Sequence, residues 1–323
     1  MTPSPNPRRV LVLGATGTIG RATTAALAAR GHQVVCLVRR PPPTPLPATA
    51  QPYIGDVTDP ATLTALFASQ RFDAIVSCLA SRTGTPSDAW AIDHAAHLAA
   101  LTAAQAVDVP QMVLLSAICV QKPRLAFQHA KLAFEQALIA SGLTWSIVRP
   151  TAYFKSLSGQ IARVQQGKPF LIFSTGALTA CKPISDADLG AYLADCLDQP
   201  ERQNRILPIG GPGPAITPRE QGHELFRLLG RPPRFRQVPV GLLDTMIATL
   251  SILGKAVPKL RDKAELARIG RYYATESMLV LDPATGRYDP DATPATGRDT
   301  LFEFYARVIR GEVRVDLGDH AVF

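Results

Sequence analysis

One stretch near the start of the chain limits most strongly what the rest can fold into. An apolar run over residues 10–13 ends at Gly14, two further glycines follow at intervals of three, Gly17 and Gly20, and an alanine-rich segment begins at once. Glycine permits the tight turn after a buried strand, lets the backbone approach a phosphate, and lets a helix pack closely on a strand. The stretch therefore predicts a strand, a turn and a helix that bind a dinucleotide, with a glycine-rich turn that binds nothing as the alternative.

The end of the next apolar run distinguishes between the two nicotinamide dinucleotides. A buried strand is predicted over residues 33–38, and it ends in Arg39 and Arg40, about 20 residues past the glycine loop, where this fold contacts the adenosine ribose. An acidic residue there would accept from the 2′-hydroxyl of NAD, whereas two arginines suit the 2′-phosphate of NADP. We therefore expect NADPH as the cofactor. The alternative is a solvated basic strand end.

Apolar runs and helical segments alternate up to residue 150. This alternation predicts an α/β fold with a Rossmann-type doubly wound parallel sheet in an NADP-binding domain over residues 1–150. Residues 151–323 are expected to form a smaller, mostly helical C-terminal substrate lobe, with some return to the sheet. The further strands are expected over 53–57, 73–80, 112–117, 143–150 and 206–211, the helices over 21–30, 59–67, 89–107, 127–140, 157–166, 186–197 and 218–229, an exposed connection over 41–52 and a loop over 167–173.

Composition excludes several classes of protein. Hydrophobic residues make up 46% of the chain and charged residues 19%, which fits a folded globular protein. The net charge is +8, but the basic residues are scattered, so no nucleic-acid partner is expected. The five cysteines are odd in number and form no C-x-x-C pair, which argues against disulfides and zinc and favours a cytoplasmic protein. No apolar stretch approaches the ~20 residues of a spanning helix.

Two histidines have a spacing that could suit a metal ion. His94 and His97 stand three residues apart on the predicted helix over 89–107. No third ligand is evident nearby, so we expect a packed or solvated helix face and no protein metal site.

A small set of residues resembles one large enzyme superfamily. The glycine loop, Ser116, Lys131 and the pair Arg149–Pro150 resemble the short-chain dehydrogenase/reductase superfamily, in its atypical NmrA-like branch. In typical members a tyrosine four residues before the lysine is the general acid, and the lysine holds the nicotinamide ribose. Here Phe127 occupies the tyrosine position. A phenyl ring donates no proton, so carbonyl chemistry through that tyrosine is not expected.

A closer resemblance extends over nearly the whole chain. Residues 127–135 and 147–160, and 167–169 together with 180–185, resemble the NADPH-dependent 3,8-divinyl (proto)chlorophyllide 8-vinyl reductases of chlorophyll and bacteriochlorophyll biosynthesis. The resemblance implies that hydride from NADPH and a proton reduce a vinyl group to ethyl. The macrocycle accepts the developing charge, so Phe127 is consistent with this chemistry. Plant members carry a transit peptide, whereas here none is expected, which suits a photosynthetic bacterium. The resemblance thus implies a chlorophyllide-type partner, whose ring holds the magnesium, and a cytoplasmic protein, peripheral to photosynthetic membranes.

The resemblance also suggests roles for individual residues. Lys131 is assigned to the nicotinamide ribose and Tyr153 is the candidate proton donor, the alternative being that Tyr153 and Phe154 only wall the nicotinamide or the macrocycle. Residues 240–250 suit an apolar wall or a membrane-surface helix, with core packing as the alternative. The substrate contacts are expected from Tyr153, Phe154 and Lys155, and the cofactor contacts from Gly14, Thr16, Gly17, Thr18, Ile19, Gly20, Arg39, Arg40, Asp56, Val57, Cys78, Leu79, Ala80, Ser116, Lys131, Pro150, Thr151 and Ala152.

Two other functions fit the same residues. NmrA-like chains can bind the cofactor without turnover, so a regulatory NADP sensor is the main alternative, and the missing tyrosine favours it. An assembly or scaffold protein that keeps the fold and binds the cofactor structurally is the third possibility.

Asp56 has two interpretations, because its carboxylate could hold the adenine amine or simply form a turn after its strand.

Overall fold

The computed structural model describes residues 4, 6–42, 44–255 and 257–315, which form two compact units. The first unit runs to Arg82 and takes in Ser87–Pro150 and Asp186–Pro208. The second contains Thr83–Pro86, Thr151–Ser185 and the described residues from Ile209 onward. Residues 186–208 thus belong with the first unit, which is where the chain after residue 150 returns to the sheet.

A seven-stranded sheet forms the centre of the first unit, as the alternating pattern predicts. β1 lies between β2 and β4, and these strands and their neighbours pair in parallel. The apolar runs of β1, β2, β4 and β5 are buried on both faces, which is typical of parallel strands covered by helices. The strands are β1 (Arg9–Leu13), β2 (Gln33–Val38), β3 (Ala50–Ile54), β4 (Ala74–Ser77), β5 (Gln111–Leu115), β6 (Thr144–Pro150) and β8 (Arg205–Ile209), in the order β3-β2-β1-β4-β5-β6-β8.

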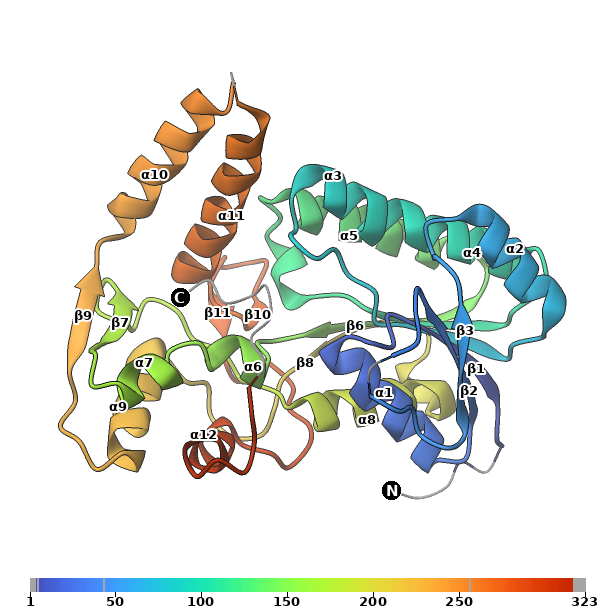
Figure 1. Cartoon of the computed structure of the whole chain (residues 1–323), viewed down its shortest axis with the longest axis horizontal. Helices are drawn as coiled ribbons and strands as arrows, with labels where there is room; N and C mark the ends of the chain where they lie inside the picture. The colour runs from blue at the N-terminus through green and yellow to red at the C-terminus, as the bar shows by residue number, and fades with distance from the viewer. Residues whose placement is uncertain (1–3, 5, 43, 256, 316–323) are drawn as a thin grey trace. The chain divides into compact units, whose positions relative to one another are not determined.

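Helices cover both faces of this sheet (Figure 1). On one face α2, α4 and α5 pack into a core cluster that includes Leu66, Leu101 and Phe134. On the other face α1 packs against α8. The helices are α1 (Thr18–Ala29), α2 (Pro60–Ser69), α3 (Pro86–Ala89), the π-helix η1 (Trp90–Ala96), α4 (His97–Gln105), the 3₁₀ helix η2 (Ile118–Gln121), α5 (Ala126–Ile139), α8 (Asp186–Asp198) and the 3₁₀ helix η3 (Pro200–Arg202).

The second unit is mostly helical, with two small sheets. Strand β7 pairs in parallel with β9, and β10 pairs antiparallel with β11. Tyr305 of α12 is fully buried, and its hydroxyl donates to Leu157 O at 2.5 Å. The elements are α6 (Phe154–Leu157), α7 (Ile161–Gln165), β7 (Phe170–Phe173), α9 (Pro218–Leu228), β9 (Phe235–Val238), α10 (Val240–Leu253), α11 (Pro258–Thr275), β10 (Val280–Leu281), β11 (Tyr288–Asp289) and α12 (Leu301–Ile309).

Three sequence expectations were wrong in detail. The third strand begins at Ala50 rather than at residue 53, and Pro52 is tolerated because β3 is the edge strand. The single helix expected over 157–166 is broken near Gly159 into α6 and α7. The loop expected over 167–173 contains β7, whose partner β9 lies far away in the sequence. Local patterns do not reveal such distant pairings.

Candidate functional site

The glycine loop has the geometry that its spacing predicts. Gly14 adopts φ +75°, and a Cβ there would lie 2.6 Å from Cys78 O. A Cβ on Gly20 would lie 2.1 Å from Gly14 O. Gly17 is different, because its Cβ would meet only Gly14 O at an ordinary 3.4 Å. The chain's own packing therefore requires glycine at 14 and 20, whereas glycine at 17 leaves bare, exposed backbone that suits a phosphate.

Helix α1 begins directly at this bare backbone. Gly17 is its N-cap, no described side chain caps that end, and its first turn holds no acidic residue. The first N–H groups of a helix lack intrahelical partners, and the helix dipole places positive charge there. Ile19 points inward and is 7% exposed, so it contributes packing and its backbone N–H. The loop and helix start thus have the geometry and the positive dipole end that favour an anion such as a dinucleotide pyrophosphate.

A hollow of about 330 Å³ lies beside the loop. Thr16 lines it from the loop, Arg21 and Thr24 from α1, and Pro42 and Pro45 from the proline-rich segment after β2. Arg21 is exposed and was not among the predicted contacts, although its place one residue after Gly20 was a usable signal. Bare backbone, an uncapped helix start and this hollow together fit a nicotinamide dinucleotide.

The predicted adenosine contacts lie after β2 and β3. Arg39 and Arg40 are both exposed just past β2. Asp56 Oδ1 accepts from Thr58 N at 2.9 Å and from Thr58 Oγ1 at 2.8 Å. These bonds, with a smaller contribution from the charge of Arg39, lower the pKa of Asp56. Asp56 therefore forms a turn as an ionised carboxylate, and its adenine contact stays a prediction. Val57 packs partly against the core cluster.

The end of β4 is fixed by a buried histidine. His97 Nδ1 lies 2.9 Å from Ile92 O, so this nitrogen carries the hydrogen. His97 Nε2 therefore accepts from Ser77 Oγ at 2.8 Å, and Ser77 Oγ accepts from Leu79 N at 3.4 Å. His97 therefore lies on the buried, packed face of its helix. No three His, Cys, Asp or Glu side chains of the described chain come together as a metal site. The network holds the backbone N–H of Leu79, which lies between Cys78 and Ala80 among the predicted cofactor contacts.

His97 makes stability depend on pH. Burial, and then the charge of Lys131, lower its pKa from 6.5 to about 4. Between these values the unfolded chain binds a proton at this site and the folded chain does not, so stability is lost as pH falls. We expect the free energy of unfolding to fall by about 2 kcal/mol more in the wild type than in His97→Gln between about pH 7 and about pH 5. Urea unfolding at both pH values measures this. Equal losses in both proteins would contradict it.

Lys131 of α5 is held by an acidic residue that the sequence pattern did not single out. Its Nζ lies 2.9 Å from Asp93 Oδ1, and the two side chains are 11% and 0% exposed. Asp93 belongs to the π-helix η1, which packs against α5. Phe127 lies in the first turn of α5 and is 8% exposed. The available signal was an acidic residue on the apolar face of the predicted helix, four positions before His97.

Ser116 belongs to a second buried ionic group. Its hydroxyl donates to Glu135 Oε1 at 2.5 Å, and Glu135 is fully buried. The Arg149 guanidinium also donates to Glu135, from Nε to Oε1 at 3.2 Å and from Nη2 to Oε2. Glu135 was not predicted. The contact between Ser116 and the cofactor stays a prediction, and the observed role of its hydroxyl is to bind Glu135. Pro150 ends β6 directly after Arg149.

The remaining predicted residues lie in the second unit. Thr151 N donates to Ile209 O at 2.9 Å, its hydroxyl donates to Lys182 O, and Ala152 O accepts from Ile184 N at 3.0 Å. Tyr153 and Lys155 are half-buried. Phe154 is 3% exposed, and its ring centroid lies 5.4 Å from that of Phe304. The ring of Phe154 is therefore part of the packed interior, and the predicted substrate contact depends on Tyr153 and Lys155.

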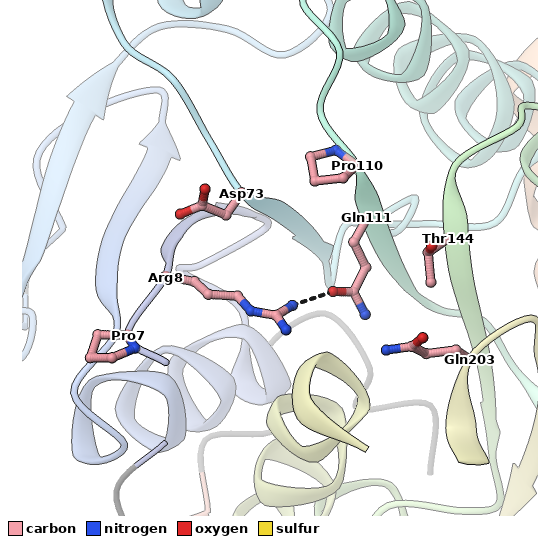
Figure 2. Close-up of a pocket in the computed structure, with 7 residues that line it drawn as sticks. All are labelled: Pro7, Arg8, Asp73, Pro110, Gln111, Thr144 and Gln203. Carbon is pink, nitrogen blue, oxygen red and sulfur yellow. Dashed lines mark hydrogen bonds between the residues drawn. The ribbon is translucent and has the colours of Figure 1, made fainter. Parts of the chain in front are cut away.

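A second hollow, of about 410 Å³, lies at the opposite end of the strands from the glycine loop. Gln111 begins β5 and Thr144 begins β6, and Figure 2 shows Arg8 donating across the hollow to Gln111. Gln111 in turn donates to Cys196 O at 3.0 Å. Ligands of parallel sheets bind at the carboxyl ends of the strands. This hollow is therefore not the cofactor site, and its polar groups hold the amino ends of the strands together.

Comparisons with known proteins agree with this site. Residues 14–200 match a family described as NAD(P)H-binding. A chloroplastic divinyl chlorophyllide a 8-vinyl-reductase of Zea mays is 50% identical over 97% of this chain and 82% of its own length. The chain belongs to the divinyl chlorophyllide a 8-vinyl-reductase family. The member from Oryza sativa subsp. indica is 49% identical over 99% of this chain and 83% of its own length.

Family membership confirms the resemblance seen in residues 127–135 and 147–160. The fold is confirmed independently. An NADPH-dependent quinone oxidoreductase of Escherichia coli, solved with NADPH, superposes with a TM-score of 0.63 and 18% identity, covering 93% of this chain and 99% of that chain. A nicotinamide cofactor is thus supported by the family and the loop geometry, while neither distinguishes the phosphorylated form from the unphosphorylated one.

Proposed function

We propose that this chain reduces the 8-vinyl group of divinyl chlorophyllide, or of the protochlorophyllide, to an ethyl group with NADPH. The observation that carries the proposal is the 50% identity to the maize reductase over 97% of the chain. The intact glycine loop and its neighbouring hollow support it, because they leave room for the reductant. The family name favours a reductase over an NADP sensor or a scaffold, both of which the missing tyrosine had kept open.

The reaction adds a hydride and a proton to one carbon–carbon double bond. NADPH supplies the hydride when bound. The backbone from Gly14 to Gly20 would bind its pyrophosphate, Arg39 and Arg40 would bind its 2′-phosphate, and Lys131 would bind its nicotinamide ribose. The chain's task is to place the vinyl carbon within roughly 3–3.5 Å of the hydride donor and to exclude water. Tyr153 would donate the proton to the second vinyl carbon, since Phe127, at the position of the usual tyrosine acid, carries no ionisable hydrogen.

The assay follows the conjugation of the macrocycle. Purified protein is incubated with NADPH and divinyl chlorophyllide, and absorption and product mass are recorded. Loss of the vinyl conjugation shifts the absorption bands to the blue, and the product gains two hydrogen atoms. No mass gain while NADPH is still bound would overturn the reductase and favour the sensor. Tyr153→Phe should lower the rate of product formation without weakening NADPH binding, and full turnover would exclude Tyr153 as the donor.

The hairpin of α10 and α11, in the second unit, suits contact with a membrane surface (Figure 1). Of the residues of α10, all described, only Leu243 is buried, which excludes core packing for most of this segment. Near the turn between the helices, Ile252 is 65% exposed, Leu253 51% and Val257 47%. Three exposed cations stand close to them in sequence, Lys255, Arg261 and Lys263. Exposed apolar side chains with cations close to them in sequence, among which Asp262 is the one exposed acid, fit an anionic lipid surface. Within the described residues, no helix has the length and hydrophobicity to cross a bilayer.

The hairpin proposal predicts binding to vesicles. The wild type should sediment with phosphatidylglycerol vesicles and not with phosphatidylcholine vesicles, and salt should weaken the binding because the cations act through charge. Replacing Ile252 and Leu253 by serine should lower the bound fraction at least about tenfold, since two exposed apolar side chains lose their burial in the lipid. Leu178→Ser is the control, because Leu178 is 50% exposed outside the hairpin. Undiminished vesicle binding with weaker chlorophyllide binding would instead make the hairpin a wall for the macrocycle.

A further inference from the structure

Asp93 joins three elements of the first unit through one oxygen. Its Oδ1 accepts from Lys131 Nζ at 2.9 Å and from Ser81 N at 3.2 Å. Lys131 belongs to α5, Ser81 follows the end of β4, and Asp93 itself lies in the π-helix η1. The carboxylate therefore ties the lysine to the loop beyond β4, at the end of the sheet where ligands of this fold bind.

The second oxygen of the Asp93 carboxylate destabilises the folded protein. Asp93 is 1% exposed, and its Oδ2 is buried with no hydrogen-bond partner among the described residues. A buried carboxylate oxygen without a partner destabilises a folded protein, and a buried ion pair is often no more stabilising than apolar residues of similar size. The π-helix that carries Asp93 is itself a rare geometry that occurs frequently at functional sites. Stability alone therefore does not account for a charge at this position.

We propose that Asp93 is a positioning residue that fixes the Lys131 ammonium for the nicotinamide half of the cofactor. The inference rests on the role proposed for Lys131. A lysine has four rotatable side-chain bonds, and an ammonium with no anchor would extend into water. Because Asp93 holds Nζ before the ligand arrives, binding need not order the side chain, which preserves affinity. The anchor to Ser81 N keeps this position aligned with the loop after β4.

The test compares NADPH with a ligand that contains only the adenosine and 2′-phosphate half of NADPH. Adenosine 2′,5′-bisphosphate contains the adenosine and the 2′-phosphate but lacks the nicotinamide ribose. Asp93→Asn is isosteric and keeps an acceptor for Ser81 N, while it removes the negative charge that holds the Lys131 ammonium. Binding of the bisphosphate shows that the variant is folded. By calorimetric titration we expect Asp93→Asn to raise the Kd for NADPH roughly tenfold, and to leave the Kd for the bisphosphate within about twofold. The control is Asp108→Asn, because Asp108 is exposed in the turn after α4 and should change neither value.

A second background separates this inference from the proposed role of Lys131. In Lys131→Met, NADPH binding should be weakened, and adding Asp93→Asn should weaken it no further, because Asp93 acts through the lysine. Equal weakening of both ligands by Asp93→Asn, or unchanged NADPH binding, would overturn the positioning role. NADPH binding unaffected by Lys131→Met would instead refute the lysine's own role.

Discussion

Replacing Arg149 by methionine is expected to lower the free energy of unfolding by about 3 kcal/mol, because it leaves a buried charge without its partner. Glu135 is fully buried, and the guanidinium of Arg149, which is 16% exposed, binds both of its oxygens. After the substitution the Ser116 hydroxyl is the one hydrogen-bond donor among the described residues that still binds the carboxylate. A single neutral donor does not compensate for the lost hydration of a carboxylate in the core.

The double variant Glu135→Leu with Arg149→Met separates charge from packing. It removes both charges and keeps apolar volume, so it should regain most of the stability that Arg149→Met loses. Urea unfolding followed by circular dichroism measures all three proteins under one set of conditions. A double variant no more stable than Arg149→Met would show that the pair contributes through packing and that the unpaired charge matters little.

The fold was predictable because its signals are local. The runs that became β1 and β2 are continuous and apolar, and the spacing of Gly14, Gly17 and Gly20 encodes a turn whose steric demands the structure displays directly. The β7–β9 pair was not predictable in this way. Its two strands are short and distant in sequence, and no local period predicts that one will find the other.

The residues of the candidate site also differ in how well the sequence predicts them. Arg39 was predicted as a cofactor contact from its distance to the glycine loop, and Lys131 from the superfamily resemblance, and both contacts stay predictions. Asp93 and Glu135 were missed because their importance lies in what they touch, and touching depends on the packing of helices against each other and the sheet. Each is an acidic residue on the apolar face of a helix, which is the general signal for a buried ion pair. Phe127 shows the opposite case, in which one residue type excluded a familiar mechanism from the sequence alone.

The cofactor preference is the function-related quantity with the largest expected change. Arg39→Asp with Arg40→Ala should weaken NADPH binding by on the order of 100-fold, because two charge-assisted contacts to the 2′-phosphate are lost. NADH affinity should change by less than about threefold, since NADH has no phosphate at this place. The hydrogen bonds from Thr58, and to a smaller extent the charge of Arg39, lower the pKa of Asp56, so its carboxylate stays ionised beside the altered position. The new carboxylate at position 39 would also repel the 2′-phosphate, which adds to the loss for the phosphorylated ligand.

The comparison of the two nucleotides is what makes this experiment decisive. Titration with NADPH and NADH, monitored by nicotinamide fluorescence, gives both Kd values on each protein. Arg71→Asp is the charge control, because Arg71 is exposed before β4, at the opposite end of the strand from the cofactor. It should leave the ratio of the two affinities unchanged. If the double variant weakened the binding of both nucleotides equally, the arginines would support the loop in general and would not select the phosphorylated cofactor. Arg21, which lines the neighbouring hollow, would then be the next residue to replace.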